Sequence, residues 1–328
     1  MHHPDPVLTA SLYSNRGLDD VVAQVVAPFR HALAAEAPGA WGLWMVRYSR
    51  CGEHLKLRLH GPAGAEETAA RLLAEAAERH FASLPDPEPG AARVSRADAP
   101  PIDEDDRREE DYPDRTLRLT RYLRSYVNLG WKGHLDDDRY VGLMTAAFAA
   151  GAARILDAVD AAGGRFPASG RQTVLLRAVV DGLAAAGLDG AGKAAFLAFH
   201  RDWLVRWNVA DEEREAAAAA QFDVRLGAMA RTVEQVGALA RARWEAGPAD
   251  DAWSAAVAAL VAYTEGFRGD PAYNVDPFTD EPSFPPLFKV FHSLGNALGV
   301  GMLDEAFTHH LVLRAAAPAP ALSAEGAA

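Results

Sequence analysis

The sequence predicts an α+β fold, in which a small mixed sheet at the N-terminus is followed by a mostly helical half. Within the first hundred residues, segments rich in branched and aromatic residues alternate with helical patterns in the order β-α-β-β-α-β, that of a ferredoxin-like split βαβ sheet. Beyond residue 126, apolar residues recur only at helical spacing. We therefore expect a sheet region over 1–126, a helical region over 127–314 that completes the same domain, and a disordered tail over 315–328.

Each element is predicted by a local pattern. Residues 54–60 alternate strictly between polar and apolar, and residues 41–49 are rich in the side chains that fit a pleated surface. Predicted strands lie at 8–14, 41–49, 54–60, near 92–96 and at 117–126. Predicted helices lie at 18–36, 66–81, 140–161, 171–186, 191–207, 212–245, 250–267, 287–299 and 303–313. The pattern over 212–245 is unusually long, so we expect it to break or bend.

Composition and charge exclude several classes of protein. The 328 residues include 33 Lys and Arg against 45 Asp and Glu, and the net charge of −12 lacks the basic footprint of a nucleic-acid binder. The one cysteine, Cys51, excludes intramolecular disulfides and cysteine-based zinc or iron–sulfur sites. The first residues lack the regions of a secretion signal, and apolar stretches fall short of the ~18 residues of a membrane span. We expect a cytoplasmic protein that binds neither nucleic acid nor membrane.

The strand HLKLRLH is the first candidate functional segment. Because side chains alternate across a strand, His54, Lys56, Arg58 and His60 share one face and the leucines between them share the other. The preceding strand supplies Arg47. One interpretation is an edge strand with one solvated face. The other is a cationic surface suited to hold amide oxygens or a carboxylate, and the pattern alone leaves both open.

The segment FHSLGNALG is the second candidate. His292 and Asn296 lie one helical turn apart, outside the apolar stripe of the helix. An isolated histidine on a helix is usually structural or solvated, whereas one with an asparagine at i+4 is a candidate acid–base group with an orienting partner. The apolar stripe consists of Leu287, Val290, Leu294 and Leu298.

Other polar residues have weaker signals. Tyr263 flanks a glycine-rich turn and is either a packing residue or part of a cleft. His309 and His310 are adjacent on a helix and do not share a face, which favours surface histidines over a metal site. The acidic triplet 136–138 is typical of a helix N-terminus. No familiar catalytic fingerprint and no metal-ligand spacing occurs, so the sequence predicts no metal and no cofactor.

Both candidate segments resemble motifs of one family. The run GLWMVRYSRCGEHLKLRLHG resembles the H-L-R-L-R signature of the thiopeptide-type bacteriocin biosynthesis domain, which is also the elimination domain of lantibiotic dehydratases. VFHSLGNALG resembles the closing motif of that domain, I-H-M-x-x-N-R-L-x-G. The two matches lie in the family's order near the two ends of the chain. The resemblance implies the fold of those elimination domains.

The resemblance implies one of two activities. Some members eliminate glutamate from glutamylated Ser or Thr in a precursor peptide, and others join two dehydroalanines in a formal [4+2] aza-cycloaddition. By position, Arg58 matches the second Arg of R-L-R, and Lys56 replaces the first. His292 matches the acid–base histidine of eliminating members and Asn296 their asparagine, while Ala297 replaces the arginine that follows.

Two departures from the family pattern favour the cycloaddition. Eliminating members carry Y-x-P-E-x-x-R-Y-G-G, where this chain reads YVNLGWKGHLDDDRYVG without the Glu or the glycine pair, and their F-H-A-D-S becomes FAAGA. An elimination needs a base and a cationic clamp for the departing carboxylates, and lysine lacks the bidentate fork of arginine. We therefore predict a thiopeptide pyridine synthase. The alternatives are a stand-alone glutamate lyase and a non-catalytic scaffold that binds the precursor peptide.

The predicted site and partners follow from this interpretation. The expected partner is a ribosomally made precursor peptide with a leader and a modified core, and a homodimer is left open. Tyr263 is assigned a hydrogen bond to the reacting iminol. The predicted catalytic residues are His292, Arg58 and Tyr263, and the predicted substrate-binding residues are His54, Lys56, Arg47 and Asn296.

Overall fold

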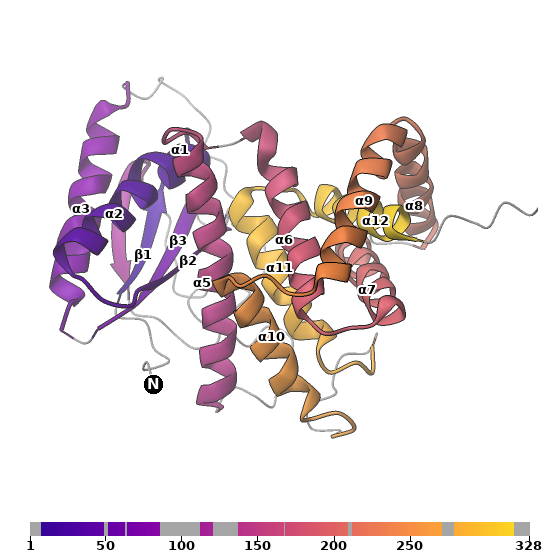
Figure 1. Cartoon of the computed structure of the whole chain (residues 1–328). Helices are drawn as coiled ribbons and strands as arrows, with labels where there is room; N and C mark the ends of the chain where they lie inside the picture. The colour runs from indigo at the N-terminus through magenta and orange to yellow at the C-terminus, as the bar shows by residue number, and fades with distance from the viewer. Residues whose placement is uncertain are drawn as a thin grey trace, which may run out of the picture.

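A computed structural model describes residues 8–48, 52–62, 64–85, 112–120, 137–166, 168–208, 212–270 and 279–317. Four antiparallel strands form one sheet near the N-terminus, in the order β2-β3-β1-β4 (Figure 1). They are β1 (Leu8–Tyr13), β2 (Gly42–Tyr48), β3 (His54–His60) and β4 (Thr116–Thr120). Among the strands that the structure describes, β3 is therefore an interior strand and β2 is an edge strand.

Helices cover one face of this sheet (Figure 1). They are α1 (Leu18–Val21), the π-helical turn η1 (Val22–Val26), α2 (Ala27–Glu36) and α3 (Glu66–Ser83). Leu55 and Leu57 of β3 lie opposite Leu12 and Ala10 of β1, and all four are at most 1% exposed. This apolar layer joins the helices in one core. The first five elements of the predicted order β-α-β-β-α-β are observed, and the strand that follows α3 among the described residues is β4, which overlaps the strand predicted at 117–126.

The second half of the chain is helical. Its helices are α5 (Asp138–Ala161), α6 (Arg171–Ala185) after the short turn η3 (Ala168–Gly170), α7 (Gly190–Asn208), α8 (Glu212–Gly227), α9 (Ala230–Ala246), α10 (Ala252–Glu265), α11 (Phe284–Leu298) and α12 (Met302–Ala316). The long pattern over 212–245 does break, into α8 and α9. Asp137 caps α5 and accepts the N–H groups of Arg139 and Tyr140, so the predicted helix N-terminus is confirmed.

The helix α5 joins the two halves. It packs on the edge strand β2 and on α6, α10 and α11 (Figure 1). By length and composition alone α5 is apolar enough to cross a membrane, contrary to the expectation that no stretch reaches that length. However, 56% of its most apolar window is buried inside the protein, and the helix serves as a core element between the sheet and the helices.

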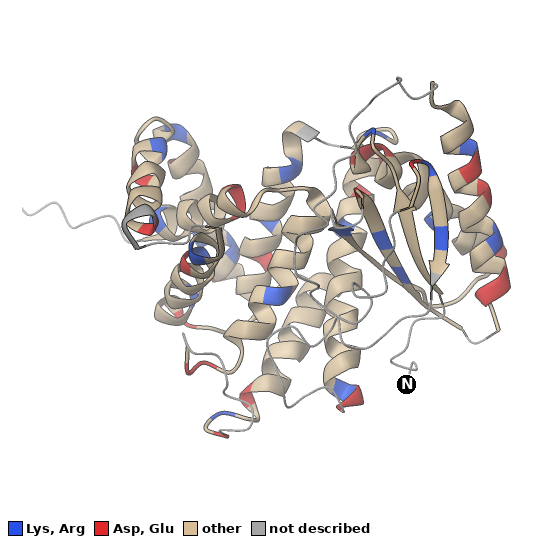
Figure 2. Ribbon diagram, turned by 180° about the vertical axis from the view of Figure 1, so that it is seen from behind, with Lys and Arg blue, Asp and Glu red and all other residues tan. Residues whose placement is uncertain are grey.

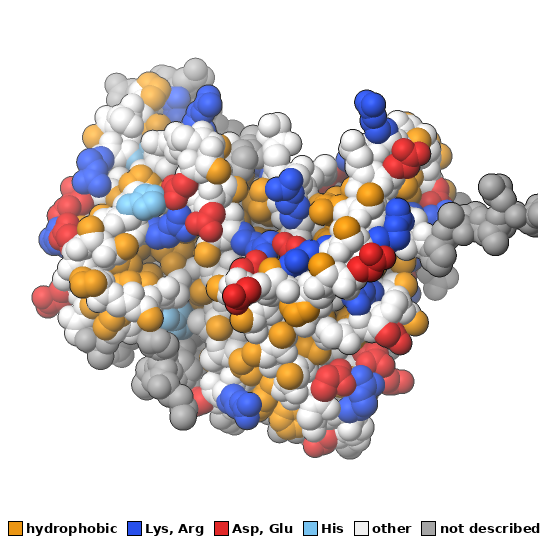
Figure 3. Space-filling model, viewed as in Figure 1, with side chains coloured by type: hydrophobic (Ala, Val, Ile, Leu, Met, Phe, Trp, Pro, Cys, Tyr) orange, Lys and Arg blue, Asp and Glu red, His pale blue; other side chains and the backbone are white. Residues whose placement is uncertain are grey.

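Charged side chains also connect the sheet to the C-terminal end of α11. Asp19 pairs with Arg47 and Arg171, each at 2.7 Å. These arginines donate to the last carbonyls of α11, from Arg47 to Ala297 at 2.8 Å and from Arg171 to Gly299 at 2.9 Å. Cations are favoured at that end of a helix. Basic and acidic side chains lie side by side across the middle of the face shown in Figure 3.

The α+β class is confirmed, with a small antiparallel sheet followed by helices. The expectation that His309 and His310 are surface residues is wrong, because they are 0% and 4% exposed. Helix α12 packs against α6, α7, α9 and α11, so two adjacent residues are both covered. The strand expected near 92–96, the continuation of β4 over 121–126 and the tail over 318–328 lie outside the described residues.

Candidate functional site

The polar face of β3 is buried. His54, Lys56, Arg58 and His60 are 0%, 2%, 0% and 8% exposed. The interpretation of this segment as a solvated edge strand is therefore wrong, because β3 lies inside the sheet and both of its faces are covered. Placing Lys and Arg in such surroundings costs free energy unless the charges are compensated. Figure 2 shows the basic residues on the strands of the sheet, seen from behind.

Aromatic rings from the neighbouring strands compensate part of this cost. The guanidinium carbon of Arg58 lies 4.8 Å from the ring centroid of Trp44, and the ammonium of Lys56 lies 4.2 Å from that of Tyr48. The register explains both contacts, since Trp44 pairs with Arg58, and Tyr48 pairs with His54, two residues from Lys56. Cation–π contacts of this kind strengthen when water is excluded. The result is a buried cationic surface bordered by aromatic rings.

Arg47 lies on the other face of the sheet. It pairs with Leu55, so its side chain shares the face of the leucines and not that of Arg58. Its guanidinium is held by Asp19 and by the carbonyl of Ala297, at 2.7 and 2.8 Å. The structure thus does not bring Arg47 together with the other predicted substrate-binding residues of the sheet, and gives it an internal contact.

Asn296 docks α11 on the edge strand β2. Its side-chain oxygen accepts the backbone N–H of Arg47 at 2.7 Å, and its amide nitrogen donates to the carbonyl of the same residue at 3.2 Å. The side chain therefore continues the hydrogen-bonding pattern of the sheet, as a neighbouring strand would. Gly299 ends the helix with φ at +71°, and a Cβ there would lie 2.8 Å from the guanidinium nitrogens of Arg47 and Arg171.

His292 faces α12. Its Nδ1 lies 3.0 Å from Oε2 of Glu305, and its ring stacks on Phe288, one turn earlier in α11. The other carboxylate oxygen of Glu305 lies 2.9 Å from Nε2 of His200 on α7. Glu305 and His200 are completely buried, whereas the side chain of His292 is 28% exposed. The hydrogen bond and the stacking of the His292 ring therefore involve α12 and its own helix.

The ionisation of this cluster follows from its surroundings. Burial alone would raise the pKa of Glu305, but the charge of His292 and hydrogen bonds from His200 and His292 outweigh it and lower that pKa to about 2. Burial lowers the pKa of His200 despite the hydrogen bond to Glu305, and lowers that of the adjacent His309 to about 3. The carboxylate is therefore ionised, and His200 and His309 are neutral.

The two predicted centres approach each other through Trp44. The ring of Trp44 makes the cation–π contact with Arg58 of β3. Trp44 also lines a small cavity together with Phe148 of α5 and Ser293 of α11. Ser293 is the residue after His292, on the partly exposed polar side of α11. Trp131 and His134, which follow the strand predicted at 117–126, and Tyr273, which flanks the same glycine-rich turn as Tyr263, lie outside the described residues. The cationic surface and α11 are thus parts of one region around the edge of β2.

Among the described residues, the contacts of Tyr263 lie outside this region around the edge of β2. It lies on α10, where its hydroxyl donates to the carboxylate of Asp137 at the start of α5. The guanidinium carbon of Arg139 lies 4.9 Å from its ring centroid. Tyr263 therefore has an internal partner at the N-terminus of α5.

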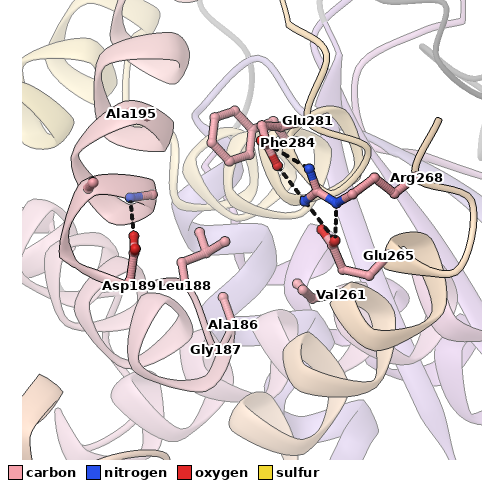
Figure 4. A pocket seen from close by; sticks show the side chains of 12 residues that line it. Ala186, Gly187, Leu188, Asp189, Ala195, Val261, Glu265, Arg268, Glu281 and Phe284 are labelled. Atoms are coloured by element: carbon pink, nitrogen blue, oxygen red, sulfur yellow. Dashed lines mark hydrogen bonds and ion pairs between the residues drawn. The ribbon is translucent and has the colours of Figure 1, made fainter.

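A cavity of about 650 Å³ lies elsewhere, between the α6–α7 loop, the end of α10 and the start of α11 (Figure 4). Its charged residues are mostly paired with one another. Arg268 lies 2.7 Å from Glu265 and 2.6 Å from Glu281 (Figure 4). These hydrogen bonds raise the pKa of Arg268 and lower that of Glu281, so neither is suited to exchange protons near neutral pH. None of the residues predicted for the site lines this cavity.

Sequence reasoning missed Glu305 and His200. The residues come from α12 and α7, and meet His292 only because those helices pack together. The sequence contains one local signal for Glu305, namely its spacing of four residues from His309 on the same helix. In the structure the backbone carbonyl of Glu305 accepts a hydrogen bond from Nδ1 of His309 at 3.0 Å. Among the described residues, no group of three or more His, Cys, Asp or Glu has the arrangement to hold a metal ion.

Fold and site together define an α+β protein with a four-stranded antiparallel sheet, whose cationic face is buried and whose edge is joined to helices. The same fold occurs in the solved structure of "Pyridine synthase, TbtD, from thiomuracin biosynthesis". The two superimpose with a TM-score of 0.57 at 16% identity, over 94% of this chain and 97% of the other. This similarity confirms the resemblance seen in the two motifs, at the level of the fold. Neither the family models nor the curated proteins compared with the chain match it.

Proposed function

We propose that this protein is a thiopeptide pyridine synthase acting in the cytoplasm on a ribosomally made precursor peptide. It joins two dehydroalanines in a formal [4+2] cycloaddition, and then releases water and the leader peptide to form a central pyridine. The observation that carries the proposal is the similarity of fold to a pyridine synthase over nearly the full length of both chains. The two motif segments support it, because the first forms β2 and β3 and the second forms α11, which is hydrogen-bonded to β2 through Asn296.

The reaction depends mainly on positioning. The two dehydroalanines must be held face to face, and hydrogen bonds must favour the iminol tautomer of one amide. Aligned partners gain up to about 7–11 kcal/mol over free reactants. Lys56 and Arg58 are cationic donors on a surface from which water is excluded, where hydrogen bonds to an amide oxygen are strongest. His54 lies beside them, stacked on Tyr13 at 4.5 Å.

Aromatisation of the cycloadduct requires proton transfers. Protons must leave carbon, and must reach the departing water and the nitrogen of the leader amide. Histidine performs both transfers near neutral pH. His292 is the histidine of the closing motif, and its ring is partly exposed. We assign it the role of acid–base group.

A glutamate-eliminating lyase is the second candidate. Buried cations such as Lys56 and Arg58 would also hold the carboxylates of a departing glutamate. The cyclase is favoured because the chain lacks the Y-x-P-E-x-x-R-Y-G-G motif, and Phe148 begins FAAGA where eliminating members have F-H-A-D-S. In the structure Phe148 packs on Trp44, with ring centroids 5.0 Å apart.

Mass spectrometry of a modified precursor peptide tests the proposal. Loss of the leader and of water from a dehydrated, azole-containing peptide is expected. Loss of glutamic acid from a glutamylated peptide would show the lyase instead, and binding without a change in mass would show a scaffold. His292→Ala is expected to stall conversion. His31→Ala is the matched control, since His31 is an exposed histidine on α2 paired with Asp160.

A further inference from the structure

Glu305 is a buried carboxylate whose two oxygens contact histidines from two different helices. Oε2 is 3.0 Å from Nδ1 of His292, and Oε1 is 2.9 Å from Nε2 of His200. An ionised carboxylate only accepts hydrogen bonds. Both ring nitrogens must therefore carry hydrogen, and the contact fixes one tautomer for each ring. For His292 this is the Nδ1–H tautomer.

We infer that Glu305 is the positioning residue of His292, because it holds Nδ1–H and leaves Nε2 as the nitrogen that exchanges protons with the substrate. This inference rests on the proposed function insofar as His292 is the acid–base group. The arrangement follows a general rule, in which a buried carboxylate orients a histidine and stabilises the imidazolium that forms when it accepts a proton. Glu305 is completely buried and acts through His292, whose side chain is 28% exposed.

The surroundings of Glu305 are built to keep it ionised. It lies in the first turn of α12, where negative charge is favoured by the helix dipole. Gly295 of α11 makes room for it, since a Cβ at that position would lie 2.7 Å from Oε2 of Glu305. The closing motif thus contributes both the histidine and the space through which the carboxylate reaches it.

The cluster holds few other charges. His200 and His309 stack with ring centroids 3.8 Å apart, and burial keeps both neutral. Within the described part of the chain, Nδ1 of His200 and Nε2 of His309 are buried and have no hydrogen-bond partner, as expected for neutral rings. Lys289, on the same side of α11, is the remaining charged neighbour that acts on His200. A change at Glu305 therefore acts on both His200 and His292, and of these two rings only that of His292 is partly exposed.

The first test is nitrogen-15 NMR of the histidines in the whole protein without substrate. At pH 8 we expect His292 to show a protonated Nδ1 and an unprotonated Nε2, with the assignment made from His292→Gln. Glu305→Gln should remove this preference. Asp223→Asn is the matched control, because Asp223 pairs with His310 on α12 at the same distance of 3.0 Å without contacting His292. A wild-type His292 protonated at Nε2, or a mixture unchanged by Glu305→Gln, would overturn the inference.

The second test is kinetic. Glu305→Gln should lower kcat for conversion of the precursor peptide by about 10- to 100-fold, less than the loss of the whole acid–base contribution of about 10²–10⁴, while KM changes less than threefold. The acidic limb of the rate profile should move to lower pH, because the imidazolium loses its carboxylate. Gly295→Ala, which displaces the carboxylate without altering His292, should act in the same direction. A Glu305→Gln protein with the parent kcat and pH profile would contradict the positioning role.

The two proposals fail separately. If the protein converts no precursor peptide but shows the expected tautomer, the proposed function is wrong and the pairing of Glu305 with His292 stands. If it converts the peptide while His292 has the other tautomer, the pairing is wrong and the function stands. The NMR measurement on the wild-type chain does not depend on Glu305→Gln, so it decides the matter even where that variant is unstable.

Discussion

Replacement of Asn296 by alanine tests whether this residue holds the sheet to the helices. Its amide accepts the backbone N–H of Arg47 and donates to the carbonyl of the same residue, at 2.7 and 3.2 Å. Alanine removes both bonds and offers no replacement. Because β2 is an edge strand against α11, the two backbone groups of Arg47 are left partly buried beside an apolar methyl group.

The expected loss can be worked out from these two groups. A buried donor or acceptor left without a partner costs about 1–3 kcal/mol, and partial exposure places each group toward the lower end. We expect Asn296→Ala to lower the free energy of unfolding by about 2–4 kcal/mol. With an unfolding entropy of about 2.1 cal/mol/K per residue, a chain of 328 residues should lose about 3–6 K in Tm.

Urea unfolding followed by tryptophan fluorescence measures this loss, since the chain has 7 tryptophans. The midpoint should fall while the slope with urea is unchanged. Ser293→Ala is the control, because Ser293 lies on the same side of α11, one turn earlier, and should change stability by less than about 0.5 kcal/mol. A loss below about 0.5 kcal/mol for Asn296→Ala, together with a raised KM for the precursor peptide, would refute the docking role in favour of substrate binding.

Four further predictions follow from particular contacts. Arg58→Lys keeps the charge but loses the planar guanidinium that lies over the ring of Trp44. Conversion of the precursor peptide should fall by about tenfold or more, with little change in the urea midpoint. Equal losses of activity and stability would indicate a structural role. Gly142→Ala, on the exposed side of α5, should stabilise the protein by about 0.5–1 kcal/mol. Gly237→Ala should destabilise it, because its Cβ would lie 2.4 Å from the carbonyl oxygen of Ala315. Calorimetry of the two variants measures both changes in Tm. Burial lowers the pKa of His309 to about 3, below its unfolded value near 6.5, so the unfolded state binds a proton that the folded state does not. The free energy of unfolding should therefore fall as pH is lowered from 6.5 toward 3. His309→Gln should make this dependence on pH flatter, and an unchanged slope would contradict the prediction. Precursor conversion should survive exhaustive chelation and desalting, and activity restored only by an added metal would argue otherwise.

Most of the secondary structure could be predicted from sequence because local patterns determine it. The strict alternation over 54–60 is β3, and the helical spacing beyond residue 126 corresponds to α5 through α12. Asp137, the acidic residue before α5, caps the helix by accepting hydrogen bonds from the backbone N–H groups two and three residues further along the chain. Such signals involve residues within a few positions of each other, and the surrounding fold hardly alters them.

The candidate site could be predicted only in part. The motif residues His292 and Asn296 do share one side of α11, as their spacing requires, but the sequence could not assign their partners. Asn296 is hydrogen-bonded to the backbone of Arg47, which lies 249 residues earlier in the sequence. His292 contacts Glu305, which also contacts His200, 105 residues earlier in the sequence. Contacts over such separations depend on how whole helices pack.

The sequence by itself determined which side chains alternate on β3, where most helices lie to within a few residues, and which residues form an apolar stripe. Only the tertiary structure decided which of these faces are covered. Arg47 lies on the leucine face because the register of β2 against β3 places it opposite Leu55, and a shift of one residue would have placed it opposite Lys56 or His54, on the polar face. His309 and His310 are both buried because α12 has neighbours on several sides. Burial is a property of the assembled layers, and no local period in the chain contains that information.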